Sequence, residues 1–147
     1  MKISKVETAA PVLRKLTSRD HWEYVEEWKA SIYLKGEGVV HLRILPGYWT
    51  DLASVPQALR GAFDNGSGSY GVLIASQAHD LLYSTHYLSR KFADNLFHAL
   101  LRYYGVGAVK AWFYYQAVHL FGGEPWERTD AELNGDRQFC RLTWLDR

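Results

Sequence analysis

The chain has little cysteine, no long apolar run and no excess of charge of either sign, and each shortage excludes a class of protein. The single cysteine, Cys140, excludes an intrachain disulfide and a cysteine-rich zinc site, and it is typical of a reducing compartment. No apolar run is long enough to span a bilayer, so we predict no transmembrane segment. The N-terminus is charged, is interrupted by Pro11 and lacks the apolar core of a signal peptide. These features predict a cytoplasmic chain.

The charge balance and the length of the chain further restrict the class of protein. Lys and Arg number 17 against 16 Asp and Glu, so no basic field indicates a nucleic-acid partner. A chain of 147 residues is long enough for one hydrophobic core, and we predict a single domain over 1–147. We interpret residues 1–20 as an N-terminal arm and residues 127–147 as a C-terminal tail, docked or extended.

Aromatic residues are the abundant class. The chain holds 6 Trp, 10 Tyr and 6 Phe, more than the core of a protein of this size needs. This excess predicts a core rich in aromatic rings together with an oligomer interface, and therefore a homo-oligomer.

The first third of the chain has the pattern of an antiparallel hairpin. From His21 to Leu34 the residues are strong strand formers, and Lys35–Gly38 forms a turn. Residues 39–44 then alternate between apolar and polar, which predicts a strand with one wet face.

Helical patterns follow. We predict a short capped helix from Ser54 to Phe63, then helices from about Tyr70 to His86, after Ser89 to Leu101, and from Ala108 to Phe121. In the last of these the residues expected to face inward are Val109, Trp112, Phe113, Gln116, Ala117 and Leu120. Residues 138–145 indicate a weak strand or docked arm. The fold class is therefore α+β, with a small antiparallel sheet formed by the N-terminal hairpin and packed against about three helices.

A His-Asp pair lies inside the apolar helical segment that follows a Gly/Ser-rich loop. At helical pitch His79 and Tyr83 share one face, while Asp80 points about 100° away. Buried polar side chains need partners, and the candidates are Thr50-Asp51 and the Gly/Ser-rich loop upstream and, in the following helix, Asp94. We expect the imidazole and the three carboxylates to converge on one cleft. An alternative role for Asp51 is a turn with nearby backbone N–H groups.

Three motifs occur in order along the chain. They are Gly-Tyr-Trp-Thr-Asp-Leu-Ala-Ser-Val-Pro at 47–56, His-Asp-Leu-Leu-Tyr at 79–83 and Ser-Arg-Lys-Phe-Ala-Asp at 89–94. Together they resemble a small family of tailed phages and prophages that is described as a domain of unknown function. The resemblance extends over roughly residues 20–126. It implies a phage protein in the cytoplasm of the infected bacterial host, or in the virion, and it implies no particular reaction.

The segment His-Asp-Leu-Leu-Tyr is also similar to the His-Asp-x-x-Tyr helix of phospholipase A2, in particular the disulfide-free viral capsid type and the bacterial type. This resemblance implies that His79 is the general base and that Asp80 binds calcium. It implies further that Asp94 orients His79 and that Tyr83 hydrogen-bonds to Asp94. Asp51 is a second candidate ligand for calcium, and the nearest counterpart of the family's calcium loop is the segment 66–71.

Two functions of different classes remain open. One is a calcium-assisted hydrolase whose substrate is a phospholipid or another ester. The other is a non-enzymatic phage protein that assembles virions or binds a host protein, in which the His/Asp cluster only fixes the docking of the helices. A third interpretation, a metal-dependent phosphohydrolase, requires more histidine ligands, and the nearest are His86 and His98. No Gly-x-Ser-x-Gly motif indicates a serine hydrolase.

Overall fold

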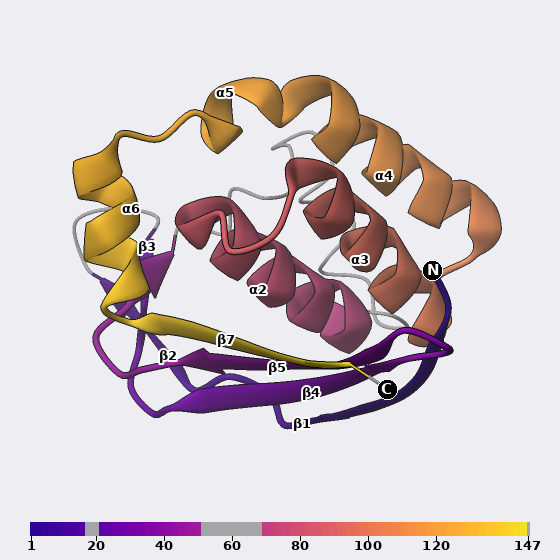
Figure 1. Cartoon of the computed structure of the whole chain (residues 1–147), viewed down its shortest axis with the longest axis horizontal. Coiled ribbons are helices and arrows are strands. Elements are labelled where there is room, and N and C mark those ends of the chain that lie inside the picture. The colour runs from indigo at the N-terminus through magenta and orange to yellow at the C-terminus, as the bar shows by residue number, and fades with distance from the viewer. Residues whose placement is uncertain (17–20, 51–68, 147) are drawn as a thin grey trace.

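The computed structural model describes residues 1–16, 21–50 and 69–146, and they form an α+β fold (Figure 1). Its larger sheet has four antiparallel strands in the order β1-β4-β5-β7. The central hairpin is β4 (Trp28–Leu34) and β5 (Gly38–Ile44), as the alternating pattern predicted. The edge strands are β1 (Ile3–Thr8) and β7 (Cys140–Asp146), so segments from both ends of the chain complete the sheet.

Gly38, where the hairpin turn meets β5, must be glycine for two reasons. Gly38 has φ of +139°, a backbone conformation that L side chains rarely adopt. A Cβ on Gly38 would also lie 2.3 Å from the backbone oxygen of Leu145 in β7. Glycine at this position therefore allows β7 to pair with β5 along its whole length.

A smaller sheet contains β2 (Leu13–Leu16), β3 (His21–Tyr24) and β6 (Trp49–Thr50), in the order β2-β3-β6. The sequence predicted one strand from 21 to 34, and this was wrong. Residues 25–27 are exposed and separate β3 from β4, so the chain passes from one sheet to the other. The N-terminal arm forms two strands, β1 and β2; a short strand or arm was expected near Val12–Leu16, where β2 lies.

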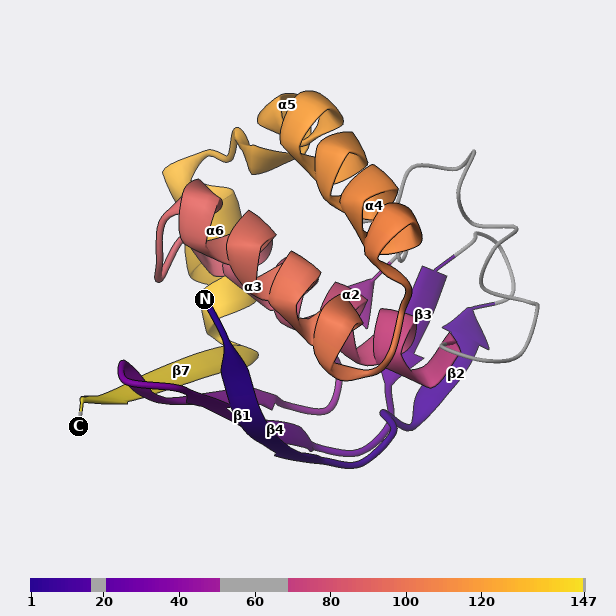
Figure 2. The same ribbon diagram turned by 90° about the vertical axis from the view of Figure 1, so that its right-hand side faces the viewer.

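The three long helices lie close to the predicted bounds. They are α2 (Ser69–Thr85), α3 (Arg90–Tyr103) and α4 (Ala108–Phe121). Ser89 is the N-cap of α3, and its side chain accepts a hydrogen bond from the backbone N–H of Phe92. Figures 1 and 2 show α2 and α3 over one face of the larger sheet and α4 as an outer layer beyond α3.

Apolar residues from the sheet and the helices form one core. Alternate residues of the hairpin, such as Ile32 and Val40, point toward the helices and are fully buried. From the helices Leu81, Leu82 and Phe97 are buried against them. Each such side chain stabilises the fold by about 1.5–3 kcal/mol. This core fixes the positions of α2 and α3.

The predicted inward face of α4 was wrong. Ala117 is buried, but Val109, Trp112, Phe113 and Leu120 are exposed, and Gln116 is half-buried. The buried residues are instead Ala111, Tyr114, Ala117 and Val118. Because α4 is apolar on nearly all sides, periodicity alone did not indicate which face packs against α3.

The C-terminal segment contains two short helices that were not predicted from the sequence, α5 (Gly123–Trp126) and α6 (Asp130–Arg137). Thr129 and Glu132 form a capping box at the start of α6, so the signal was present in the sequence. The helix predicted at 54–63 and most of the loop 66–71 lie outside the described residues. Among the helices that the structure describes, none is long and apolar enough to cross a membrane.

Candidate functional site

The interface of α2 and α3 brings together the imidazole, one carboxylate and the tyrosine singled out by the sequence. His79 and Tyr83 lie one turn apart on α2, with ring centroids 4.1 Å apart, and Asp94 faces them from α3. The ring of Phe97, one turn beyond Asp94, packs 5.0 Å from the His79 ring. His79 and Asp94 are only 2% and 1% exposed, so the cluster lies within the protein.

One carboxylate oxygen receives two hydrogen bonds. Nε2 of His79 lies 2.8 Å from Oδ1 of Asp94, and the hydroxyl of Tyr83 donates to the same oxygen at 2.7 Å. A carboxylate can only accept hydrogen bonds, so Nε2 of His79 carries the proton in this pair. In the neutral imidazole Nδ1 is then the atom with the free lone pair.

Nδ1 of His79 is buried and has no hydrogen-bond partner among the described residues. Most buried polar side-chain atoms in proteins have a partner, so an unpaired imidazole nitrogen requires an explanation. One explanation is that the lone pair of Nδ1 accepts a proton in a reaction, which would make His79 a general base.

The ionisation states follow from burial. Burial lowers the pKa of His79 below its ordinary value, and the hydrogen bond to Asp94 opposes this shift without cancelling it. His79 is therefore neutral at pH 7. Burial and the hydrogen bond to Asp94 raise the pKa of Tyr83, which keeps its hydroxyl protonated as a donor.

Arg90 belongs to this cluster and was missed as a site residue. Its Nε donates to the hydroxyl of Tyr83 at 3.2 Å and lies 3.8 Å from Oδ2 of Asp94. Its Nη2 donates to the backbone oxygen of His119 at 2.6 Å, near the end of α4. The i,i+4 spacing of Arg90 and Asp94 was the signal in the sequence. Arg90 thus joins the cluster to α4.

Asp80 lies outside this cluster. Its Oδ2 accepts a hydrogen bond of 2.7 Å from the hydroxyl of Thr50, which ties α2 to the short strand β6. Asp51, which follows Thr50 in the chain, lies outside the described residues. Four side chains were expected in one cleft. The structure places His79 and Asp94 in contact between α2 and α3, whereas Asp80 contacts strand β6.

The residues that the structure describes do not gather three His, Cys, Asp or Glu side chains into a group that could hold a metal ion. His86, a candidate ligand for a metal-dependent phosphohydrolase, stacks on Trp126 with ring centroids 3.8 Å apart. His98, the other candidate, packs near Tyr115 on α4, with ring centroids 5.5 Å apart.

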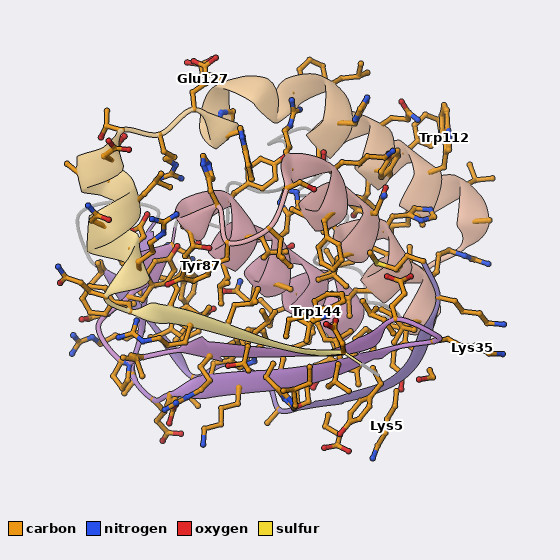
Figure 3. All side chains as sticks on the ribbon, viewed as in Figure 1. Lys5, Lys35, Tyr87, Trp112, Glu127 and Trp144 are labelled. Carbon is orange, nitrogen blue, oxygen red and sulfur yellow. The ribbon has the colours of Figure 1, made fainter. Side chains whose placement is uncertain are left out.

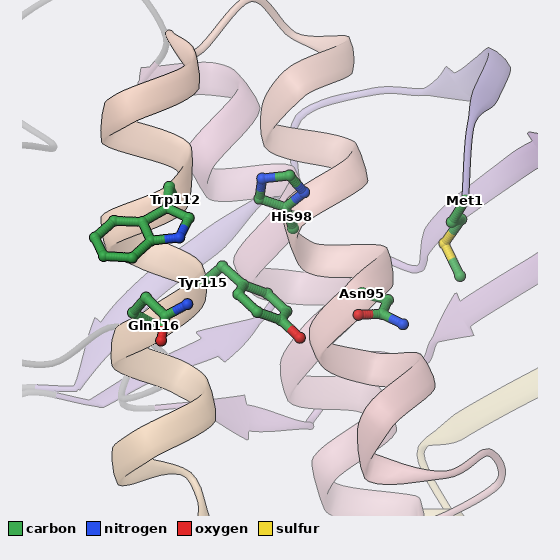
Figure 4. A pocket seen from close by; sticks show the side chains of 6 residues that line it. All are labelled: Met1, Asn95, His98, Trp112, Tyr115 and Gln116. Atoms are coloured by element: carbon green, nitrogen blue, oxygen red, sulfur yellow. The ribbon is translucent and has the colours of Figure 1, made fainter.

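A separate pocket of about 330 Å³ lies between α3, α4 and the N-terminus (Figure 4). Its lining consists of Met1, Asn95, His98, Trp112, Tyr115 and Gln116. His98 is the one described candidate from the sequence that lines it, and His79, Tyr83, Asp80 and Asp94 do not, so this hollow and the His79 cluster are distinct features.

The fold and the cluster define an α+β protein with a buried His–Asp–Tyr arrangement between its first two long helices. The chain belongs to the family described as "Protein of unknown function (DUF1353)", whose sequence profile matches residues 22–118. The matched segment runs from β3 into α4 and includes His79, Tyr83, Arg90 and Asp94. Comparison with curated proteins and with solved structures gives no match.

Proposed function

We propose that this protein is a hydrolase in which Nδ1 of His79 acts as a general base on a water molecule that attacks an ester. One observation supports this most: Asp94 fixes the tautomer of His79, and the remaining nitrogen is a base without a partner among the described residues. A lowered pKa keeps that nitrogen unprotonated near neutral pH.

The proposed reaction uses the three residues in defined roles. Nδ1 of His79 takes a proton from water as the water oxygen bonds to the ester carbonyl carbon. The imidazolium then returns this proton to the alkoxide that leaves. Asp94 stabilises the imidazolium, while Tyr83 and Arg90 hold Asp94 in place. The resemblance to phospholipase A2 makes a phospholipid or a related ester the proposed substrate.

Calcium belongs to the proposal with Asp80 and Asp51 as the ligands. When bound, calcium would polarise the ester carbonyl. Among the described residues Asp80 supplies a single carboxylate, and it is engaged with Thr50. Calcium binding is tested separately from the role of His79.

The three ordered motifs support a phage or prophage origin. On that basis we place the protein in the cytoplasm of the infected bacterium or in the virion. The same origin fits a second function, in which the protein binds a phage or host protein without catalysis. The burial of His79 and Asp94 favours this second function, as do the bonds from Arg90 to α4, because such a network also fixes helix packing.

His79→Gln tests the hydrolase. We expect it to lower hydrolysis of a short-chain phosphatidylcholine by roughly 10²–10⁴-fold, because a positioned base contributes about that factor. His98→Gln is the matched control, since His98 lies on α3 and lines the other pocket. Absence of hydrolysis by the unchanged protein on phospholipids and simple esters, with and without calcium, would exclude this function.

Asp94→Asn and Asp80→Asn separate the two functions. If the protein is a hydrolase, the Asp94→Asn variant loses part of its activity. The Asp80→Asn variant then loses its activity and also its calcium binding, which calorimetry measures. If the cluster is only structural, Asp94→Asn destabilises the fold, by about 1.5–3 kcal/mol as expected for the loss of hydrogen bonds to a charged group. If His79→Gln and Asp94→Asn are simply less stable and neither protein nor variant binds calcium, the hydrolase proposal fails.

A further inference from the structure

Helix α4 carries a second apolar face that no described residue covers. The outer face, as we call it, consists of Val109, Trp112, Phe113 and Leu120, together with Phe121 at the end of the helix; their exposed fractions run from 52% to 71%. Figure 3 shows Trp112 projecting from α4 away from the rest of the molecule. Val109, Phe113 and Leu120 recur at helical spacing, on the side opposite the buried Ala111 and Val118.

The outer face is large enough to form an interface. At about 150–250 Å² for each aromatic side chain, the exposed parts of its five residues amount to roughly 600 Å². The largest apolar patch of a typical monomer is about 300–600 Å², so the outer face lies at the upper end of that range, and a standard interface buries about 800 Å² on each partner. The half-buried Gln116 and the charged residues at the ends of α4 supply the remaining area.

We propose that the outer face binds the outer face of a second copy of this chain, with the two α4 helices antiparallel about a two-fold axis. Charge supports this arrangement. Lys110 lies in the first turn of α4, and Glu124 lies just beyond its last residue; both are exposed. Antiparallel pairing brings Lys110 of each copy toward Glu124 of the other. It also aligns the two helix dipoles favourably.

The position of Gln116 fits the same symmetry. It lies near the middle of the outer face, between Trp112 and Leu120 along the helix. At a two-fold axis a residue meets its own copy, and two glutamine amides can exchange a pair of hydrogen bonds. Trp112 and Gln116 also line the pocket between α3 and α4, so the outer face continues into a hollow that can receive a side chain of the second copy (Figure 4).

A membrane surface is the other occupant that an aromatic helix face could have. Helices that lie on membranes carry Lys and Arg beside the apolar face, which attract anionic lipids. Lys110 is the single Lys or Arg of α4, and the exposed residues that follow the helix, Glu124 in α5 and Glu127 at its C-cap, are acidic. The second copy is therefore the better fit.

The mass of the full chain in solution tests the proposal. Sedimentation over a range of concentrations should show a dimer, and Leu120→Glu should raise its dissociation constant on the order of 100-fold, as for a central interface residue. Val25→Glu is the control, because Val25 is also an exposed apolar residue but lies between β3 and β4. Circular dichroism should show the same fold for both variants.

Charge exchange and cross-linking test the orientation. Lys110→Glu and Glu124→Lys should each weaken the dimer, and the double variant should restore it. Gln116→Cys should form a disulfide-linked dimer on oxidation, whereas Val109→Cys should not, because an antiparallel pair places residue 109 near the other end of its partner. The natural Cys140 is buried and gives the background.

Three results would overturn the proposal. The first is a chain that stays monomeric at every concentration measured. The second is a dimer whose dissociation constant Leu120→Glu leaves unchanged. The third is a disulfide-linked dimer formed by the Val109→Cys variant and not by the Gln116→Cys variant. A monomer that floats with vesicles of anionic and zwitterionic phospholipid, and loses this with Leu120→Glu, would assign the outer face to a membrane instead.

Discussion

The imidazole of His79 lies where burial lowers its pKa, and this links the stability of the fold to pH. In the unfolded chain a histidine titrates near pH 6.5. Between the folded and the unfolded pKa the unfolded state binds more protons, so the free energy of unfolding rises with pH. Stability is therefore present above about pH 6.5 and is lost as the pH falls toward the lower, folded pKa.

We expect urea denaturation between about pH 8 and pH 5 to show this loss, and His79→Gln to reduce it. Burial also lowers the pKa of His98, which acts in the same direction, so His98→Gln gives the size of that contribution. An identical pH dependence in the unchanged protein and in His79→Gln would contradict the buried, neutral imidazole.

For single residues, the sequence predicted contacts between side chains that lie one turn apart on the same helix. The i,i+4 spacing of His79 and Tyr83 placed both rings on one face, and the structure has them there. The separation of Asp80 from His79 by the helix turn was also predictable, but its partner Thr50 comes from a distant strand. Thr50 and Asp51 were among the partners expected for the His-Asp pair, but the sequence did not indicate which of the two side chains would contact Asp80, because a contact between a helix and a distant strand leaves no local signal.

Among the elements, the end of α4 is held by Arg90 from the start of α3. Arg90→Lys keeps a positive charge but loses the guanidinium, whose nitrogens donate to Tyr83 and to backbone oxygens of α4. We expect faster amide hydrogen exchange in residues 114–122, with the exchange of α2 less affected. Unchanged exchange at the end of α4 would mean that packing alone holds this helix.

The residue that follows α4 gives a second test of this junction. A Cβ on Gly122 would lie 2.5 Å from the hydroxyl of Tyr83, whereas a Cβ on Gly123 would find only a nitrogen of Arg90 at 3.7 Å. Gly122→Ala should therefore destabilise the fold, by about 1–3 kcal/mol as for overpacking. Gly123→Ala should have a smaller effect. Thermal unfolding of both variants measures the difference, and equal effects would contradict the close approach.

Element positions were largely predictable because their caps and breaks are local. Ser89 before α3 and the glycines around α4 gave bounds near those observed. The face of α4 was not predictable, since a helix that is apolar on opposite sides has no unique inward direction. Its residues Ala111, Tyr114 and Ala117 are buried, whereas the rings of Trp112 and Phe113 are exposed.

For the whole molecule, the strand β7 lies outside the segment that the family profile matches, yet it completes the larger sheet. It pairs with β5 from Gly38↔Asp146 to Ile44↔Cys140. Deletion of residues 138–147 should leave β5 as an exposed edge and produce aggregation. Light scattering of the shortened chain measures this, and a stable, dispersed product would show that β7 is dispensable.

The pairing of β5 with β7 also bears on how fast the protein forms. The two strands are separated by roughly a hundred residues, including every helix of the described chain, so the loop between them must close late. A hairpin of β4 and β5 can assemble early on the ribosome, but its second edge stays open until β7 has been synthesised. During translation this unpaired edge can bind another chain, so we expect a chaperone to protect it until β7 is made.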